Sequence, residues 1–232
     1  MPQHSKRYLE LTKKVDRSRY YTVEQAVTLL RDLANAKFDE SLEVAIRLNV
    51  NPSKGEENVR GTVVLPHGTG RVRRVAVFAE GEAAQEAREA GADRVGAEDL
   101  VEAIQNGWDE FDVLVAQPQL MRIVGPLGRA LGPRMPSKKA GNVLPDVASA
   151  VRQLKAGRIE FRVDRGGVVH APVGRNSFTH EQLMENTQTL LQSVTAARPA
   201  AVSGRYILKA AMSSTMSPGL RLDLEDVRAQ AA

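Results

Sequence analysis

Two clusters of polar and basic side chains are the parts of this sequence best suited to chemistry, and that chemistry is the binding of an anion. Ser213–Gly219 places four hydroxyls and a methionine on a bend between two expected strands. Hydroxyls and exposed amides bind phosphate oxygens and RNA 2′-hydroxyls. The second cluster, Lys37–Ser41, contains Phe38, which could stack on a base or belong to the core. The composition of the bend also suits an ordinary turn, so that alternative stays open.

Patterns for catalysis or metal binding are not found in the sequence. The four histidines are scattered without the spacing of a metal site, and there is no cysteine. Gly68–Gly70 begins like a dinucleotide-binding loop but precedes a strand, where such a loop should follow one. Gly125–Arg134 is rich in glycine but lacks the lysine of a phosphate-binding loop. We therefore expect no catalytic residue, no metal and no cofactor.

Charge is sorted along the chain, although 32 basic and 28 acidic residues leave a formal net charge of only +4. Residues 121–145 and 186–222 contain no acidic residue. The first stretch carries five cations that we predict to form a secondary nucleic-acid surface: Arg122, Arg129, Arg134, Lys138 and Lys139. Two long acid-free basic stretches favour a polyanionic partner over ordinary solvated faces. Because only 4% of the residues are aromatic, we expect recognition by shape, ribose and phosphate contacts.

The same bulk properties predict a cytoplasmic protein that does not enter a membrane. The lack of cysteine is typical of a reducing compartment. No apolar run approaches the roughly 20 residues that a membrane-spanning helix needs.

The pattern of expected elements changes character twice, which predicts two domains. The outer segments combine alternating strands, such as Ser41–Leu48, with amphipathic helices, such as Thr179–Ala197. The middle alternates continuous apolar strands with short helices, as in a parallel α/β sheet. Glycine- and proline-containing segments at 66–70 and 155–158 are the expected hinges. Residues 159–163 and 168–173 flank a turn sequence and predict a β-hairpin.

Seven stretches, in colinear order from about Tyr20 to Leu222, resemble the bacterial form of large-subunit ribosomal protein L-one, the protein of the mobile side stalk. They are Ala36–Glu40, Asn58–Gly68, Glu89–Asp93, Leu127–Arg134, Lys155–Arg162, His170–Gly174 and Thr215–Pro218. Seven ordered matches are more specific than any single motif described above. The resemblance implies an RNA-binding protein of the large ribosomal subunit that is not an enzyme.

This resemblance also implies a fold, α/β and α+β. Residues 1–68 and 157–232 would form a split, RNA-binding α+β domain, and residues 69–156 an inserted Rossmann-like α/β domain. By resemblance, the RNA contacts fall on Phe38, Ser41, Thr215, Met216 and Ser217. Lys37 and Ser213 belong to the same clusters, and we add Arg60, His170 and Lys209 on charge and location.

The partners implied by the resemblance are all RNA. They are large-subunit ribosomal RNA, exit-site transfer RNA and the messenger of the protein's own operon, whose translation it would repress. We expect a monomer within the ribosome.

Two departures from the family pattern affect the predicted sites. Ser217 stands where the family usually has glycine, and its Cβ would be costly if the backbone needed a positive φ. After Arg134 the chain continues Met-Pro-Ser-Lys-Lys, two residues shorter than the family pattern.

Two other functions are compatible with parts of the sequence. The α/β insertion is also typical of nucleotide-binding enzymes, and a saturable heat shift with a nucleotide would favour that function. A basic protein could also be a DNA-binding regulator, which competition between duplex DNA and structured RNA would reveal.

Overall fold

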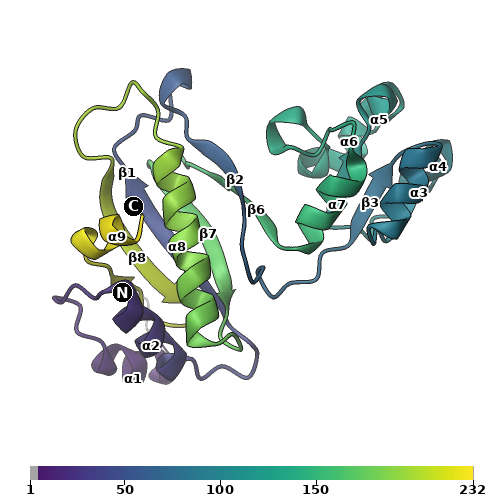
Figure 1. Ribbon diagram of the computed structural model, residues 1–232. Coiled ribbons are helices and arrows are strands. Elements are labelled where there is room, and N and C mark those ends of the chain that lie inside the picture. The colour runs from purple at the N-terminus through teal and green to yellow at the C-terminus, as the bar shows by residue number, and fades with distance from the viewer. Residues whose placement is uncertain (1–4, 232) are drawn as a thin grey trace. The chain divides into compact units, whose positions relative to one another are not determined.

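The computed structural model describes residues 5–231 of the 232-residue chain and, for Lys139, the backbone alone. The chain forms two compact units, one up to Gly70 and again from Ile159, and the other from Arg71 to Arg158. The chain therefore leaves unit 1 once and returns to it once (Figure 1). Each crossing lies two residues after the position that we expected from the sequence.

Unit 1 is built on a four-stranded antiparallel sheet in the order β7-β1-β8-β9. Its strands are β1 (Ser41–Leu48), β7 (Val168–Arg175), β8 (Ile207–Ser214) and β9 (Leu220–Arg221). The helices of unit 1 are α1 (Lys6–Lys14), α2 (Val23–Leu33), α8 (His180–Ala196) and α9 (Leu224–Gln230), with a 3₁₀ turn η1 (Gly55–Glu57). Figure 1 shows α8 lying across one face of the sheet.

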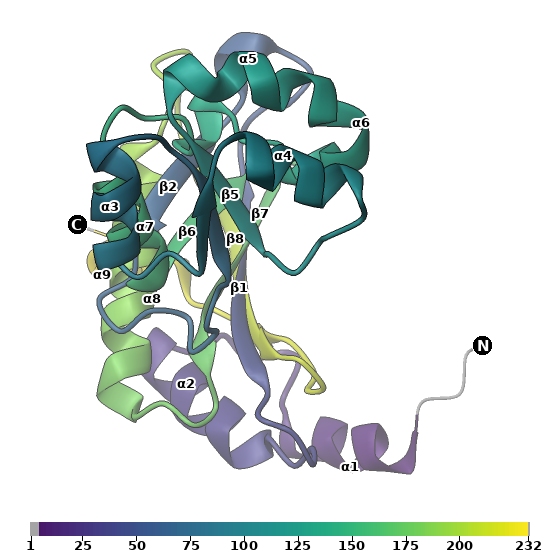
Figure 2. The same cartoon turned by 90° about the vertical axis from the view of Figure 1, so that its right-hand side faces the viewer.

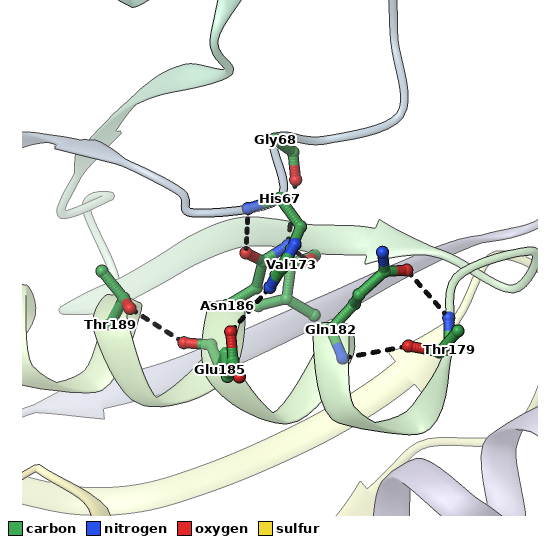
Figure 3. Close-up of polar contacts among 8 residues, drawn as sticks. All are labelled: His67, Gly68, Val173, Thr179, Gln182, Glu185, Asn186 and Thr189. Carbon is green, nitrogen blue, oxygen red and sulfur yellow. Dashed lines mark hydrogen bonds and ion pairs between the residues drawn. The ribbon is translucent and has the colours of Figure 1, made fainter.

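Local sequence rules account for these elements. Every second residue of β1 from Leu42 to Leu48 is buried, as the alternation predicted. The N-cap of α2, Thr22, accepts a hydrogen bond from the amide of Gln25. Thr179 and Gln182 form a reciprocal capping box that begins α8 (Figure 3).

The expected hairpin after residue 158 forms only at its turn. The Asp164 carboxylate accepts the amide of Val168 at 2.8 Å, and Val163 and Val169 form a single bridge. Beyond that bridge, β6 (Arg158–Arg162) pairs with β2 (Arg60–Val64), whereas β7 pairs with β1. The ring of Phe161 in β6 lies against Gly61 in β2, where a Cβ would come within 2.6 Å of the ring. Because β6 pairs with β2 and not with β7, the hairpin prediction was wrong beyond the turn.

The glycine- and proline-containing segment at 66–70 is attached to α8. The buried Asn186 side chain accepts the amide of His67 at 3.1 Å and donates to the carbonyls of Gly68 and Val173 at 2.9 and 2.8 Å (Figure 3). His67 Nε2 also lies 2.6 Å from a carboxylate oxygen of Glu185. Residues 67 and 68 of the predicted hinge are therefore held to unit 1, and residues 71–74, which follow it, are neither helix nor strand.

Unit 2 is an α/β layer structure on a three-stranded parallel sheet in the order β4-β3-β5. The strands are β3 (Val75–Phe78), β4 (Arg94–Gly96) and β5 (Val113–Ala116). The longer helices are α3 (Glu82–Glu89), α4 (Glu98–Gln105) and α7 (Val147–Lys155). The shorter helices are η2 (Pro118–Leu120), α5 (Met121–Val124), η3 (Gly125–Leu127), α6 (Gly128–Leu131), η4 (Gly132–Arg134) and η5 (Lys138–Ala140).

Helices cover both faces of this sheet, as Figure 2 shows. Residues of α3 and α7 pack on one face, and residues of α4, α5 and α6 pack on the other. The stretch Pro118–Leu131 forms short helical turns, because Pro126 interrupts it and Gly132–Pro133 follow its end. The predicted fold class, an α/β unit inserted into an α+β unit, is confirmed. No helix of residues 5–231 has the length and hydropathy to span a membrane.

Candidate nucleic-acid interface

The two polar clusters meet at one end of the sheet of unit 1. Leu42 of β1 is paired with Ser214 of β8, so the segments that precede β1 and follow β8 lie side by side. The Ser41 amide donates to Thr215 Oγ1 at 3.0 Å, and the Thr215 amide donates to the Ser41 carbonyl at 3.0 Å. We call residues 37–41 and 213–217 the recognition corner.

A buried carboxylate holds the recognition corner together. Glu40 is 2% exposed, and its two oxygens accept three hydrogen bonds. One comes from the Ala36 amide at 3.2 Å, and the others come from the Ser214 hydroxyl at 2.7 Å and the Met216 amide at 3.0 Å. Charge-assisted bonds of this kind are among the stronger ones in proteins. The carboxylate therefore fixes both segments in one arrangement before any ligand binds.

Two large apolar side chains stand exposed on this corner. Phe38 is 54% exposed and Met216 is 42% exposed. The alternative that Phe38 belongs to the core is therefore wrong. An exposed ring and a thioether beside hydroxyls and exposed backbone suit contact with a base or ribose.

Ser217 fits the backbone of the bend without strain. None of the described residues other than glycine has a positive φ, so the predicted cost of a Cβ does not arise here. The Ser217 hydroxyl accepts the Ser214 amide at 3.0 Å and can donate to the Pro218 carbonyl at 3.2 Å. The serine thus stabilises the turn that a glycine would leave to the backbone alone.

Cations line the uncovered face of the same sheet. Arg47 of β1 lies directly opposite Lys209 of β8, and His170 of β7 lies opposite Ala45. A groove of about 440 Å³ on this face is lined by residues that include Tyr20, Arg47, Lys209 and Arg221. Its lining contains no acidic residue among those described. Because like charges directly opposite across strands are destabilising, this arrangement suits an anionic partner.

Arg60 lies apart from the recognition corner. It is on β2, and its guanidinium forms an ion pair with Glu160 of β6, with distances of 2.6 Å from Nε and 2.5 Å from Nη2. The structure therefore does not bring Arg60 together with the other predicted contacts.

The basic stretch of unit 2 divides into exposed and engaged cations. Arg122, Arg129 and Lys138 are exposed, and the structure describes no ion pair for them. Arg134 donates to the carbonyls of Asp109 and Phe111 at 3.2 Å each, and its guanidinium lies 4.8 Å from the centre of the Phe111 ring. Arg134, which we predicted for the secondary nucleic-acid surface, therefore has partners within unit 2.

The carboxyl edge of the parallel sheet is poorly suited to a nucleotide. Ligand phosphates bind there at the amino ends of the helices that follow the strands. In this chain α3 begins beside Glu80 and Glu82, and α4 begins with Glu98 and Asp99. The Asp99 carboxylate itself accepts the Ala97 amide at 2.8 Å. Among the residues described, no group of three or more His, Asp or Glu side chains could hold a metal ion.

Sequence reasoning missed Glu40 and Arg47 as site residues. A signal for Glu40 was present in the sequence. Extending the alternation of the buried positions Leu42, Val44 and Ile46 back by two residues places Glu40 on the same buried face. A carboxylate in phase with a core face must find partners, because an unpaired buried charge is costly. Arg47 is in phase with the opposite face, and only the strand register shows that it lies beside Lys209.

Comparison with known proteins gives the family. Residues 30–218 match the Ribosomal protein L1p/L10e family. The chain belongs to this family. It is 50% identical over 229 residues to the large ribosomal subunit protein uL1 of Kosmotoga olearia, covering 98% of this chain and 99% of that protein. It is 49% identical over 225 residues to the protein of the same name from Lactobacillus johnsonii, covering 96% and 98%.

Membership in the L1p/L10e family confirms the resemblance found in the sequence. The matched region begins within α2 and ends at Pro218, so it includes both segments of the recognition corner and all of unit 2. Helix α1 precedes the matched region. Membership in a family of ribosomal proteins implies a structural role.

Proposed function

We propose that the protein is a structural constituent of the large ribosomal subunit and binds large-subunit ribosomal RNA at the mobile side stalk through the recognition corner. The family supports a ribosomal role. The observation that carries the site is the buried Glu40, which holds exposed Phe38 and Met216 in a fixed arrangement. Groups fixed before binding lose little conformational entropy when a ligand binds.

The uncovered face of the sheet would extend this contact. A base or ribose would rest on Phe38 and Met216, and the hydroxyls of the corner would bond 2′-hydroxyl and phosphate oxygens. His170 and Lys209, with Arg47 beside them, would then meet the phosphate backbone that continues across the face. Arg60 is the least suited of the predicted contacts because Glu160 neutralises it.

Two further roles follow from the resemblance to the side-stalk protein. Unit 2 would contact exit-site transfer RNA, with Arg122, Arg129, Lys138 and Lys139 as its secondary surface. The recognition corner would also bind a messenger of the same operon that presents the ribosomal shape, and so repress its translation. The protein would act as a monomer within the ribosome, in the cytoplasm.

A substitution at Met216 tests the proposed site. We expect Met216→Asp to weaken binding of a transcript of the side-stalk region of the ribosomal RNA by at least about tenfold, because a carboxylate would face phosphates. The side chain is 42% exposed, so the fold should be unchanged by circular dichroism. Val72→Asp is the matched control, because Val72 is 84% exposed and lies outside unit 1. Equal affinity of the Met216 variant and the wild type would refute the site.

The identity of the RNA needs a separate measurement. Sequencing the RNA that copurifies with the protein at moderate salt should give ribosomal RNA, because weak phosphate binding is lost there. Enrichment of transfer RNA or of the protein's own messenger would support the two further roles. Recovery of DNA alone would contradict the proposal.

A further inference from the structure

The N-terminal helix carries more positive charge than its packing requires. Residues 6–19 contain six basic and two acidic residues, and helix α1 occupies the first nine of them. The helix is attached to unit 1 mainly through the buried Leu11, with Val15 directly after it. A helix with so few buried contacts gains little stability from the rest of the fold.

Helix α1 and the turn after it lie close to residues that adjoin the two segments of the recognition corner. Arg7 Nη1 is 3.5 Å from Asn35 Oδ1, two residues before Lys37. At the other end, Arg17 lines a small groove of about 170 Å³ with Asp16 and Gly219–Arg221, two residues after Ser217. The helix and the turn that follows it therefore border the corner along one side.

Three lysines of α1 have no acidic partner in the part of the chain that the structure describes. They are Lys6, Lys13 and Lys14, and the structure shows no ion pair for any of them. Asp16 is engaged elsewhere, since it accepts the amide and hydroxyl of Ser18 at 2.9 and 2.6 Å, and these bonds lower the pKa of Asp16. Asp16 therefore does not neutralise these lysines, and among the residues described the structure shows no ion pair for Glu10, the acidic residue on α1 itself.

The apolar residues of the helix point to a polyanion and away from a lipid surface. A helix that binds a membrane needs a broad exposed apolar face opposite its cations. Here Leu11 and Val15 are buried in the core of unit 1, and Leu9, 49% exposed, is the large aliphatic residue left outside. Charge without an apolar face suits contacts with phosphates.

We propose that α1 forms a phosphate-binding flank of the recognition corner and contacts the backbone of the RNA that the corner binds. This inference rests on the proposed RNA-binding function. The corner would recognise ribose and bases, whereas the flank would add contacts that do not depend on RNA sequence. Because α1 is weakly attached, binding should also stabilise the helix.

The test removes charge from the flank while keeping the helix. The triple variant Lys6→Gln, Lys13→Gln and Lys14→Gln retains good helix formers. The control variant removes three exposed cations away from the corner: Arg165→Gln, Arg205→Gln and Arg228→Gln. Affinity for the side-stalk transcript is measured between about 50 and 200 mM salt, the range over which phosphate contacts weaken strongly.

The slope of log affinity against log salt concentration decides the outcome. Each lost phosphate contact should reduce the magnitude of the slope by about 0.7–0.9. The slope of the flank variant should therefore be smaller by about 2, and the variant should bind about tenfold more weakly at physiological salt. The control should change much less. Equal losses in the two variants would overturn the proposal, because they would show a general effect of net charge. An unchanged slope in the flank variant would overturn it directly.

Hydrogen exchange of the wild-type protein gives a second readout. Amides of residues 6–14 should exchange more slowly when the transcript is bound, and unchanged exchange would also overturn the proposal. The Met216→Asp variant separates this inference from the proposed function. If Met216→Asp weakens binding while the flank variant does not, the function stands and the flank is wrong. If neither weakens binding, the recognition corner is wrong as well.

Discussion

The recognition corner of unit 1 and the basic stretch of unit 2 were both predicted to contact nucleic acid, but they are built differently. In the corner, the buried Glu40 fixes two segments and leaves Phe38 and Met216 exposed. In the basic stretch, Arg134 bonds carbonyls and stacks on Phe111 of the same unit. The recognition corner is thus organised by a buried carboxylate, whereas Arg134 of the basic stretch contacts other residues of unit 2. Positive charge in a sequence is therefore a weaker guide to a binding surface than a buried polar group that shapes one.

The largest effect is expected from removing the Glu40 carboxylate, which tests whether this residue organises the recognition corner. We expect Glu40→Ala to lower the free energy of unfolding of unit 1 by about 3 kcal/mol, because three buried bonds are lost and the Ser214 hydroxyl and Met216 amide lose their partner. Urea denaturation measures the change. Glu43→Ala, at an exposed position of β1 three residues later, should change it by less than about 0.5 kcal/mol. Equal stability of the two variants would show that the carboxylate does not organise the corner.

A smaller effect is expected when Arg134 is neutralised. Arg134→Gln should destabilise unit 2 by about 1 kcal/mol, since it removes the stacking on Phe111 and the charged donor to two carbonyls. Thermal unfolding should show the change. Arg129→Gln, at an exposed position of the same stretch, should leave the unfolding temperature unchanged. If Arg129→Gln proved the more destabilising of the two, the contacts of Arg134 would not be what stabilises unit 2.

The smallest effect concerns a carboxylate that binds other cations of unit 2. Asp112 accepts the Arg74 amide at 2.9 Å, and with the Arg74 and Arg71 guanidinium groups 3.7 and 3.6 Å away, this keeps the pKa of Asp112 below its ordinary value. A lowered pKa in the folded state contributes stability above the unfolded pKa, and that stability is lost as the pH falls through the folded value.

Asp112→Asn should therefore cost unit 2 somewhat less than about 1 kcal/mol at pH 7, because the pair is partly solvated. The difference from the wild type should shrink below about pH 4 and vanish at more acidic pH. Denaturation curves at several pH values measure it, with Glu110→Gln as the exposed neighbour for comparison. A difference that stayed constant with pH would mean that Asp112 acts through its shape and not its charge.

The elements that were predicted well depend on residues near one another in the chain. The strand Ser41–Leu48 was expected at its observed bounds, and the helix expected at Thr179–Ala197 forms over His180–Ala196, because alternation and helical spacing are local patterns. Helix α9 was missed because it is seven residues long and buries only Val227. A single buried residue gives no helical repeat that the sequence could show. The predicted hairpin was correct at Asp164, where the turn is local, and wrong beyond it, where the partner strand is about 100 residues away.

By itself, the sequence determined the family, the two-unit organisation and the segments that carry the polar residues of the candidate site. These depend on ordered motifs and on the periods of helix and strand. Tertiary structure alone decided which of those residues meet. Glu40 bonds Ser214 and Met216 across 174 and 176 positions, and Arg47 lies beside Lys209 only through the register of β1 and β8. Contacts over such separations result from packing the whole unit, and no local pattern encodes them.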